Sequence, residues 1–133
     1  MKLTSRSEYA LLALIYLARK DSGVPVTVEE IAKAQNIPPK FLEQILLGLK
    51  RARLLKSSKG QHGGFILSRR PTDICLAEVI RLFDGALAPT ESASKHFYEP
   101  TPAEKERKLI QLFRRIRDYV SAELEKTKLA DMC

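Results

Sequence analysis

The first half of the chain alternates short apolar runs with polar breaks, as expected for a small helical domain. Residues 9–18 are apolar almost all round, which is typical of a helix buried at the centre of a domain. The stretch Ser5–Glu8 has the spacing of a capping box, and Thr27–Glu30 repeats that spacing before a second, shorter apolar segment. The sequence therefore predicts helices that begin near residues 5 and 27, the first of them ending near residues 21–23.

A third helix is predicted from about Pro39 to Arg53, because proline is favoured at the first helical position. Apolar residues recur with helical spacing in this segment and leave polar side chains for the outer faces. The apolar positions are Phe41, Leu42, Ile45, Leu46 and Leu49, and the outer positions are Lys40, Glu43, Gln44, Lys50 and Arg51. Two short helices joined by a tight turn, the second with a polar outer face, form the pattern of a helix-turn-helix.

The segment after the third helix predicts a β-hairpin. Residues 54–58 and 65–68 read as short strands, and the tip between them is Lys59-Gly60-Gln61-His62-Gly63-Gly64. Its three glycines permit positive φ angles and a slim tip. A basic, glycine-rich hairpin directly after a recognition helix indicates a wing that lies along the DNA backbone or enters the minor groove. A hairpin whose tip makes no contact is the alternative.

The second half predicts a linker between two further helices. A helix over Leu76–Phe83 ends at Asp84-Gly85, where glycine can adopt a left-handed cap. Residues 86–100 contain few aliphatic side chains and read as a linker. Thr101-Pro102-Ala103-Glu104 then combines an N-cap, a proline at the first helical position and a capping-box glutamate, which predicts a long helix to about Thr127.

This last helix carries an apolar stripe spaced by three and four residues: Leu109, Leu112, Phe113, Ile116, Val120 and Leu124. Such a helix has more apolar surface than a small domain can readily cover, which favours packing against a second subunit. The alternative is that the stripe folds back on its own chain. The expected fold is mainly α with a small β-wing, divided into a winged helix-turn-helix (1–85), a linker (86–101), and a dimerisation helix with its tail (102–133).

Charge supports a nucleic-acid partner for the first half. The formal net charge is +7, and residues 1–70 hold 13 Lys and Arg against 5 Asp and Glu, whereas residues 71–133 hold 10 against 11. Residues 37–70 contain a single acid, Glu43, beside a cluster of cations. Those cations are Lys40, Lys50, Arg51, Arg53, Lys56, Lys59, Arg69 and Arg70. Such a cluster is the expected footprint of a phosphate-binding surface, although a merely solubilising surface would look similar.

Other classes of protein find little support in the chain. Cys75 and Cys133 are too few for a disulfide scaffold, and neither belongs to a Cys-x-x-Cys metal pair. The first apolar run is about half as long as a membrane span requires, so we expect no signal peptide or membrane anchor and a cytoplasmic location. We also expect no enzyme, because the sequence offers no phosphate loop, nucleophile motif or metal-ligand set.

In these motifs the sequence resembles the winged-helix regulators of the IscR/NsrR/CymR type, over nearly its whole length. The resemblance is carried by residues 3–10, Ile31-Ala32, residues 37–46, Leu49, residues 59–65 and residues 76–80. It implies a homodimer on a palindromic operator, with the third helix in the major groove and the wing in the minor groove. We expect a repressor; a winged-helix module that acts through a partner protein is the alternative.

The resemblance also implies roles for individual residues. Lys40, Glu43 and Gln44 become candidates for base contacts, since glutamine can bond adenine and glutamate can accept from cytosine. Lys59 becomes the residue that enters the minor groove, whose narrow, electronegative form suits a cation. The expected phosphate neighbours are Arg6, Ser58, Gln61 and His62, with Gly60 shaping the wing tip; Lys50 and Arg51 are either phosphate contacts or solvated surface.

The sequence departs from the cluster-binding members of that family in one respect. Those members hold an iron–sulfur cluster with three cysteines before the long helix, whereas residues 86–103 here contain no cysteine. We therefore expect no cofactor, and His96 in this segment reads as a surface residue rather than a ligand. Cys75 is expected at the N-cap of the fourth helix, where a thiol is either inert or redox-active. The signal sensed, whether a small molecule or a regulatory protein, is left open.

Overall fold

The computed structural model describes residues 1–20 and 22–133, so the part of the expected first-helix end that falls on Asp21 lies outside the described residues. The helices are α1 (Ser5–Lys20), α2 (Val28–Gln35), α3 (Pro39–Arg51), α4 (Leu76–Asp84) and α5 (Arg107–Lys126). A two-stranded antiparallel sheet pairs β1 (Leu55–Ser58) with β2 (Gly64–Leu67). The expected fold, mainly α with a small β-wing, is confirmed.

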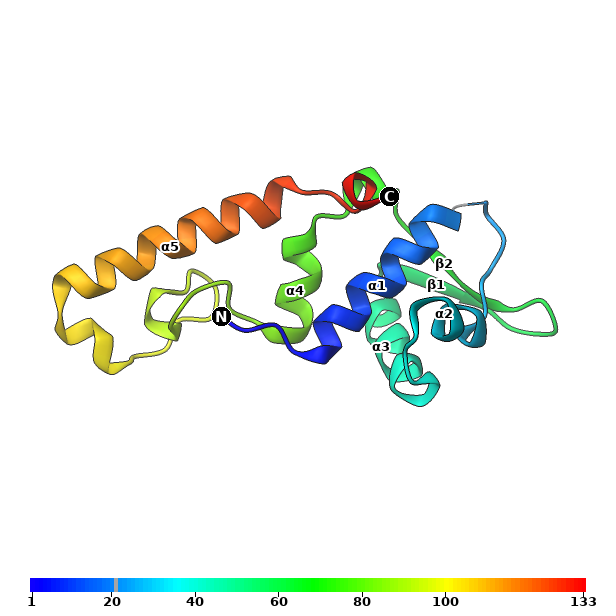
Figure 1. Cartoon of the computed structure of the whole chain (residues 1–133), viewed down its shortest axis with the longest axis horizontal. Helices are drawn as coiled ribbons and strands as arrows, with labels where there is room; N and C mark the ends of the chain where they lie inside the picture. Colours follow the sequence, from blue (N-terminus) through cyan, green and yellow to red (C-terminus); the bar gives the residue numbers. More distant parts are fainter. Residues whose placement is uncertain (21) are drawn as a thin grey trace.

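α1 runs through the middle of the molecule, between α4 on one side and α2 and α3 on the other (Figure 1). Its central position explains why its apolar residues point in nearly all directions: Ala10, Ala13 and Leu14 are fully buried. The main core joins these residues to the inner side of α3 and to the base of the hairpin.

The two predicted capping boxes form only in part. Thr27 caps α2 by accepting a hydrogen bond from the Glu30 N–H, but the Glu30 carboxylate accepts from the Tyr16 hydroxyl at 2.5 Å instead of reaching back to the cap. The box predicted on Ser5 was wrong, since Ser5 is already the first residue of α1. The preceding residue, Thr4, directs its hydroxyl to Asp84 at the end of α4.

The hairpin is attached to the domain by a third extended residue. Val26, just before α2, exchanges two backbone hydrogen bonds with Phe65 of β2, at 2.9 and 2.8 Å. The approach is so close that a Cβ atom on Gly64 would lie 2.4 Å from the Val26 carbonyl oxygen. Only glycine therefore fits at position 64, and the direction of the wing is fixed relative to α2 and α3.

The long C-terminal helix begins later than predicted. Residues Pro102–Lys105 form a separate 3₁₀ turn, and α5 starts at Arg107 after an extended Glu106. The expected capping box at Thr101 is absent because the Thr101 hydroxyl is engaged with Thr90 and Ser92. Residues 86–101, expected as a linker, pack closely: Ser92 and Ala93 are buried beneath α5.

The chain after α5 returns to the N-terminal domain, which the sequence pattern did not predict. Residues Leu129–Met132 form a short 3₁₀ helix that packs against α1, and the Leu129 side chain is fully buried in the main core. Backbone hydrogen bonds from Leu129 to Ile74 and from Leu76 to Thr127 attach this tail to the start of α4. α5 is therefore anchored to the domain at its C-terminal end.

The apolar stripe of α5 divides between two faces. Phe113 packs with buried Ile110 against Ala88 and Ala93, and Leu124 joins a cluster at α4. The other face is exposed, with exposed fractions of 39% for Leu109, 40% for Leu112, 40% for Ile116 and 76% for Tyr119. The stripe thus folds back on its own chain in part, and the remainder has no partner within the described residues.

Candidate nucleic-acid interface

α3 presents a polar outer face that is held rigidly from behind. Its inner residues Leu42, Ile45, Leu46 and Leu49 are fully buried, so the rotation of the helix about its axis is fixed by the core. The residues between them are exposed as the helical period requires. They are Lys40, Glu43, Gln44, Lys50 and Arg51.

Leu47 lies at the centre of this outer face and was missed by the sequence reading. It is one turn from both Glu43 and Gln44 and is only partly buried. An apolar side chain among polar ones can contact a thymine methyl group in the major groove. The periodicity of α3 could have revealed it, because Leu47 falls outside the buried row of the helix.

Most cations of the basic cluster are free of ion pairs. Among the described residues, no salt bridge involves Lys40, Lys50, Arg51, Arg53, Lys56 or Lys59. Arg69 and Arg70 differ, since Arg69 pairs with Glu78 at 2.5 Å and Arg70 with Asp73 at 3.1 Å. The unpaired cations of the cluster therefore lie on α3, the turn after it and the hairpin, and not in the segment after β2.

The wing projects beyond the helices at the end of the molecule opposite the start of α5 (Figure 1). Its tip is a turn closed by a hydrogen bond from the Gly63 N–H to the Gly60 carbonyl, 3.0 Å long. Gly60 has a φ of 101°, which explains the glycine there. The remaining tip residues are exposed on this turn: Ser58, Lys59, Gln61 and His62.

Arg6 lies near the C-terminal end of α3 although it belongs to α1. Arg6 and Arg51 line one shallow hollow, whose floor includes Gly48 and Phe83. The structure thus brings together two cations that are far apart in the sequence. The N-terminus of α1 extends the basic surface of α3 on the side away from the wing.

The other residues singled out by the sequence lie elsewhere. Cys75 is the N-cap of α4, as expected, but its thiol makes no capping hydrogen bond. Cys133 is exposed, and its thiol approaches the Leu129 carbonyl at 3.6 Å. His96 is exposed in the segment before α5. None of these residues belongs to the surface formed by α3 and the wing.

The described part of the chain offers no arrangement of donors suited to a metal ion, and no group of three or more His, Cys, Asp or Glu side chains comes together there. The segment before α5 is held by hydroxyl groups instead, with Thr101 bonded to Thr90 and Ser92. None of the helices described combines the length and the apolar character that a membrane crossing requires.

Comparison with known proteins identifies relatives over the whole of this architecture. The family model Rrf2, described as an iron-dependent transcriptional regulator, matches residues 3–133. The transcriptional regulator CymR of Bacillus subtilis is 33% identical over 132 residues, which cover 99% of this chain and 89% of that protein.

Solved structures agree with these relatives. The structure of CymR, the global cysteine regulator of B. subtilis, superposes with a TM-score of 0.80 at 32% identity, covering 99% of this chain and 95% of that one. The structure of IscR from T. potens superposes with a TM-score of 0.76 at 26% identity, covering 99% and 85%. Both are matched across the wing and α5, because the alignments leave almost none of this chain uncovered.

Proposed function

Because the chain belongs to the Rrf2 family of transcriptional regulators, we propose that it binds a palindromic operator as a homodimer and represses transcription there. α3 is the recognition helix and enters the major groove, while the wing reaches the adjacent minor groove. A bound dimer excludes other proteins from the same DNA, which makes repression the simplest output.

The observation that carries this proposal is the row of unpaired cations on one continuous surface. In the described part of the chain, the Lys and Arg residues of α3, β1 and the wing tip lack acidic partners, although the chain holds 16 Asp and Glu. A surface that leaves its cations unpaired repels itself, which is costly unless phosphates neutralise it.

Base recognition is assigned to the exposed face of α3. Gln44 can form a bidentate contact with adenine and Glu43 can accept from the cytosine amino group, whereas Lys40 suits guanine. Leu47 adds an apolar contact for a thymine methyl group. Lys59 reaches into the minor groove, and the phosphate contacts come from Arg6, Lys50, Ser58, Gln61 and His62.

Dimerisation is assigned to the exposed apolar face of α5, made of Leu109, Leu112, Ile116 and Tyr119. This face borders an apolar hollow between α5 and the N-terminus, lined by Met1, Ala88, Pro89, Ile116 and Val120. Covering it with the same face of a second copy removes several large apolar side chains from water. The two recognition helices then read the two halves of a palindrome.

We propose further that operator binding needs no iron–sulfur cluster. The family description names iron, but the donors here do not fit a cluster. Thiolates are the usual ligands, and the two cysteines are Cys75 at the start of α4 and Cys133 at the end of the chain. The segment before α5 is closed by the hydroxyl groups of Thr90, Ser92 and Thr101 rather than by thiolates.

Selection of bound duplexes from a random-sequence pool, followed by sequencing, tests this function. A palindromic consensus whose affinity falls steeply with salt is expected, because phosphate contacts release counterions. A winged-helix module that acts through a partner protein would enrich no sequence and would show little salt dependence. The polar outer face of α3 and the unpaired cations of the wing weigh against that alternative.

A further inference from the structure

A second group of unpaired cations lies on α5, away from the wing. Residues 105–117 hold six Lys and Arg against a single acid, Glu106, which gives this stretch a balance of +5. Among these six, and within the described residues, only Arg117 takes part in a salt bridge, with Asp118. The other five are all exposed: Lys105, Arg107, Lys108, Arg114 and Arg115. The proposed operator contacts account for none of them.

The cations of α5 lie on the side of the helix between its two apolar faces. One side of the helix packs on the domain through Ile110, and the adjacent side carries the exposed apolar face assigned to dimerisation. The cations occupy the remaining side in two neighbouring rows, each joining residues about two turns apart. We name this set the α5 basic face: Arg107, Lys108, Arg114 and Arg115. Lys108 and Arg115 lie one turn from Leu112 at the edge of the exposed apolar face, whereas Arg107 and Arg114 lie farther from it.

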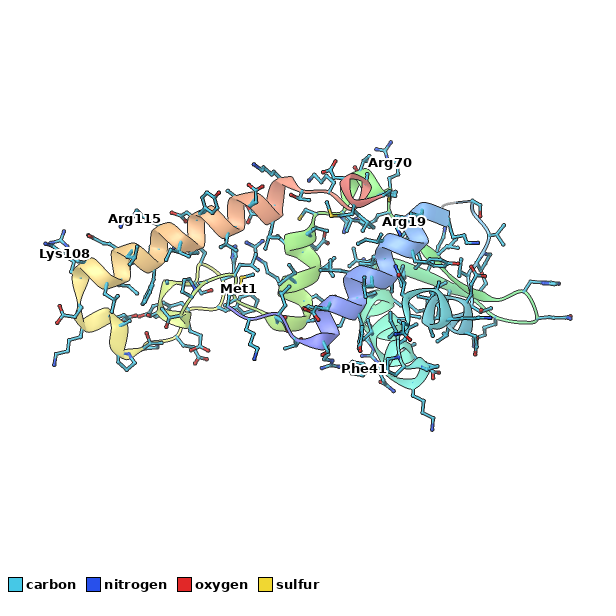
Figure 2. The ribbon with its side chains drawn as sticks, viewed as in Figure 1. Met1, Arg19, Phe41, Arg70, Lys108 and Arg115 are labelled. Atoms are coloured by element: carbon cyan, nitrogen blue, oxygen red, sulfur yellow. The ribbon has the colours of Figure 1, made fainter. Side chains whose placement is uncertain are left out.

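The α5 basic face is also remote from the recognition helix of the same subunit. α5 packs on α4, α4 packs on α1, and α1 in turn packs on α3. In Figure 2, Lys108 and Arg115 lie along the outer edge of α5, whereas Phe41 of α3 lies on the opposite side of the molecule. Within one subunit, α4 therefore lies between this face and α3, and Phe83 of α4 reaches Gly48 of α3.

The acids in the C-terminal half of α5 are engaged within their own subunit. In the C-terminal half of α5, Asp118 pairs with Arg117 and Lys95, Glu123 with Lys126, and Glu125 with Arg81. These three acids are therefore not free to pair with the α5 basic face of a second copy. Four exposed, unpaired cations on one side of a helix form a surface that suits a polyanion.

The composition of the face favours nucleic acid over an acidic protein. Three of its four cations are arginines, whose planar guanidinium groups match phosphate oxygens in a bidentate manner. Gln111 lies between them, and Asp118, which pairs with Arg117 and Lys95, lies one turn beyond Arg114 and Arg115. The four positions include no aromatic or large apolar side chain. Stable protein interfaces are usually anchored by such side chains, whereas backbone contacts to DNA need only charge and hydrogen bonds.

We propose that the α5 basic face binds the phosphate backbone of a second DNA segment, without base recognition, while α3 and the wing hold the operator. The proposal rests on the proposed function, because it requires the first surface to be occupied by an operator. It gives the dimer a means of joining an operator to a distant stretch of DNA.

Two short duplexes in different fluorescent colours test the proposal. The full-length protein is first saturated with the selected operator duplex, and binding of a non-operator duplex is then measured between 50 and 200 mM salt. We expect the second duplex to bind and its affinity to fall by roughly 40-fold over this range, as contacts with about three phosphates would give. In the variant Lys108→Gln/Arg114→Gln/Arg115→Gln, this affinity should fall at least about tenfold at low salt, with operator binding unchanged.

The matched control, Arg19→Gln/Lys33→Gln/Arg70→Gln, removes the same charge from surfaces away from α5 and should still bind the second duplex with wild-type affinity. Equal losses in both variants, or unchanged binding in the α5 variant, would overturn the proposal. Binding of polyglutamate in place of the duplex would also overturn it, in favour of an acidic protein partner. The fluorescence of the operator duplex tests the proposed function separately. If no operator binds, a loss of affinity for the non-operator duplex in the α5 variant, but not in the control, still supports binding of DNA by the α5 basic face.

Discussion

Thr4 donates two hydrogen bonds to the carboxylate of Asp84, one from its backbone N–H at 2.9 Å and one from its hydroxyl at 2.6 Å. The pair joins the start of α1 to the end of α4 across 80 positions of sequence. Burial, the largest single influence, would raise the pKa of Asp84, but the two hydrogen bonds from Thr4 and the nearby Ser7 hydroxyl together hold the pKa below its ordinary value. This junction therefore depends on the charge of one carboxylate.

Replacing that carboxylate, in Asp84→Asn, should lower the free energy of unfolding at pH 7 by about 1–2 kcal/mol. Because the folded state depresses the pKa, the contribution is full above the unfolded pKa and is lost as the pH falls through the folded one. The difference between wild type and variant should thus shrink below about pH 4, as urea unfolding at pH 7 and pH 3 would show. Glu99→Gln, at an exposed position, serves as the control. An equal difference at both pH values would contradict the assignment.

Lys59→Ala should weaken operator binding and reduce its salt slope by about one unit, because one cation no longer replaces a counterion in the minor groove. Fluorescence anisotropy at several salt concentrations measures both quantities. Lys95→Ala removes an exposed cation far from the wing and should change neither. If the Lys59 variant keeps the wild-type slope, the wing tip makes no charged contact with DNA.

Gln44→Ala and Glu43→Ala should each change the preferred base at one or two operator positions, with a loss of about 1–3 kcal/mol for the cognate base pair. Lys50→Ala is the matched comparison on the same helix, since a phosphate contact weakens binding to all sequences alike. Affinities for a panel of single-base operator variants distinguish the two patterns. A uniform loss for Gln44→Ala would assign that residue to positioning rather than to recognition.

The helices and the wing could be predicted because each is specified locally. Thr27, Pro39 and Gly85 mark ends of α2, α3 and α4 through caps and backbone preferences that depend on few neighbours. The outer face of α3 follows from the helical period, so Lys40 and Gln44 were found to be exposed without knowledge of the fold.

Features that depend on distant residues could not be predicted in this way. Thr101 has the sequence of an N-cap, yet its hydroxyl bonds to Thr90 and Ser92. The residues after it form a separate 3₁₀ turn that ends at an extended Glu106, so α5 starts only at Arg107. Leu129 belongs to a tail with no periodic pattern, and only the tertiary fold shows that it fills the core beside α1. The engagement of Arg69 with Glu78 likewise depends on how α4 packs, so local charge counting overestimated the basic surface.

Gly64→Ala should reduce operator affinity by changing the direction of the wing, because its Cβ atom would lie 2.4 Å from the Val26 carbonyl oxygen. The backbone there must shift, which weakens the bridge between Val26 and Phe65. Gly48→Ala is the control: its Cβ atom would meet Phe83 at an ordinary distance of 3.5 Å, inside a helix where alanine is favoured. Operator affinity and thermal unfolding of both variants measure the effect. Wild-type affinity in Gly64→Ala would show that the wing direction does not matter.

Ile116→Asp should convert the proposed dimer to monomers that bind palindromic DNA poorly, because it places a charge on the exposed apolar face of α5. Ile116 is 40% exposed in the single subunit, so the substitution need not disturb the fold. Phe113→Asp would be less informative, since Phe113 packs against Ile110 and the loss of that contact could unfold the segment. Ala122→Asp introduces the same side chain at an exposed position off the apolar face and should leave the dimer intact. Light scattering reports the oligomeric state, and a dimeric Ile116→Asp protein would move the subunit interface away from this face.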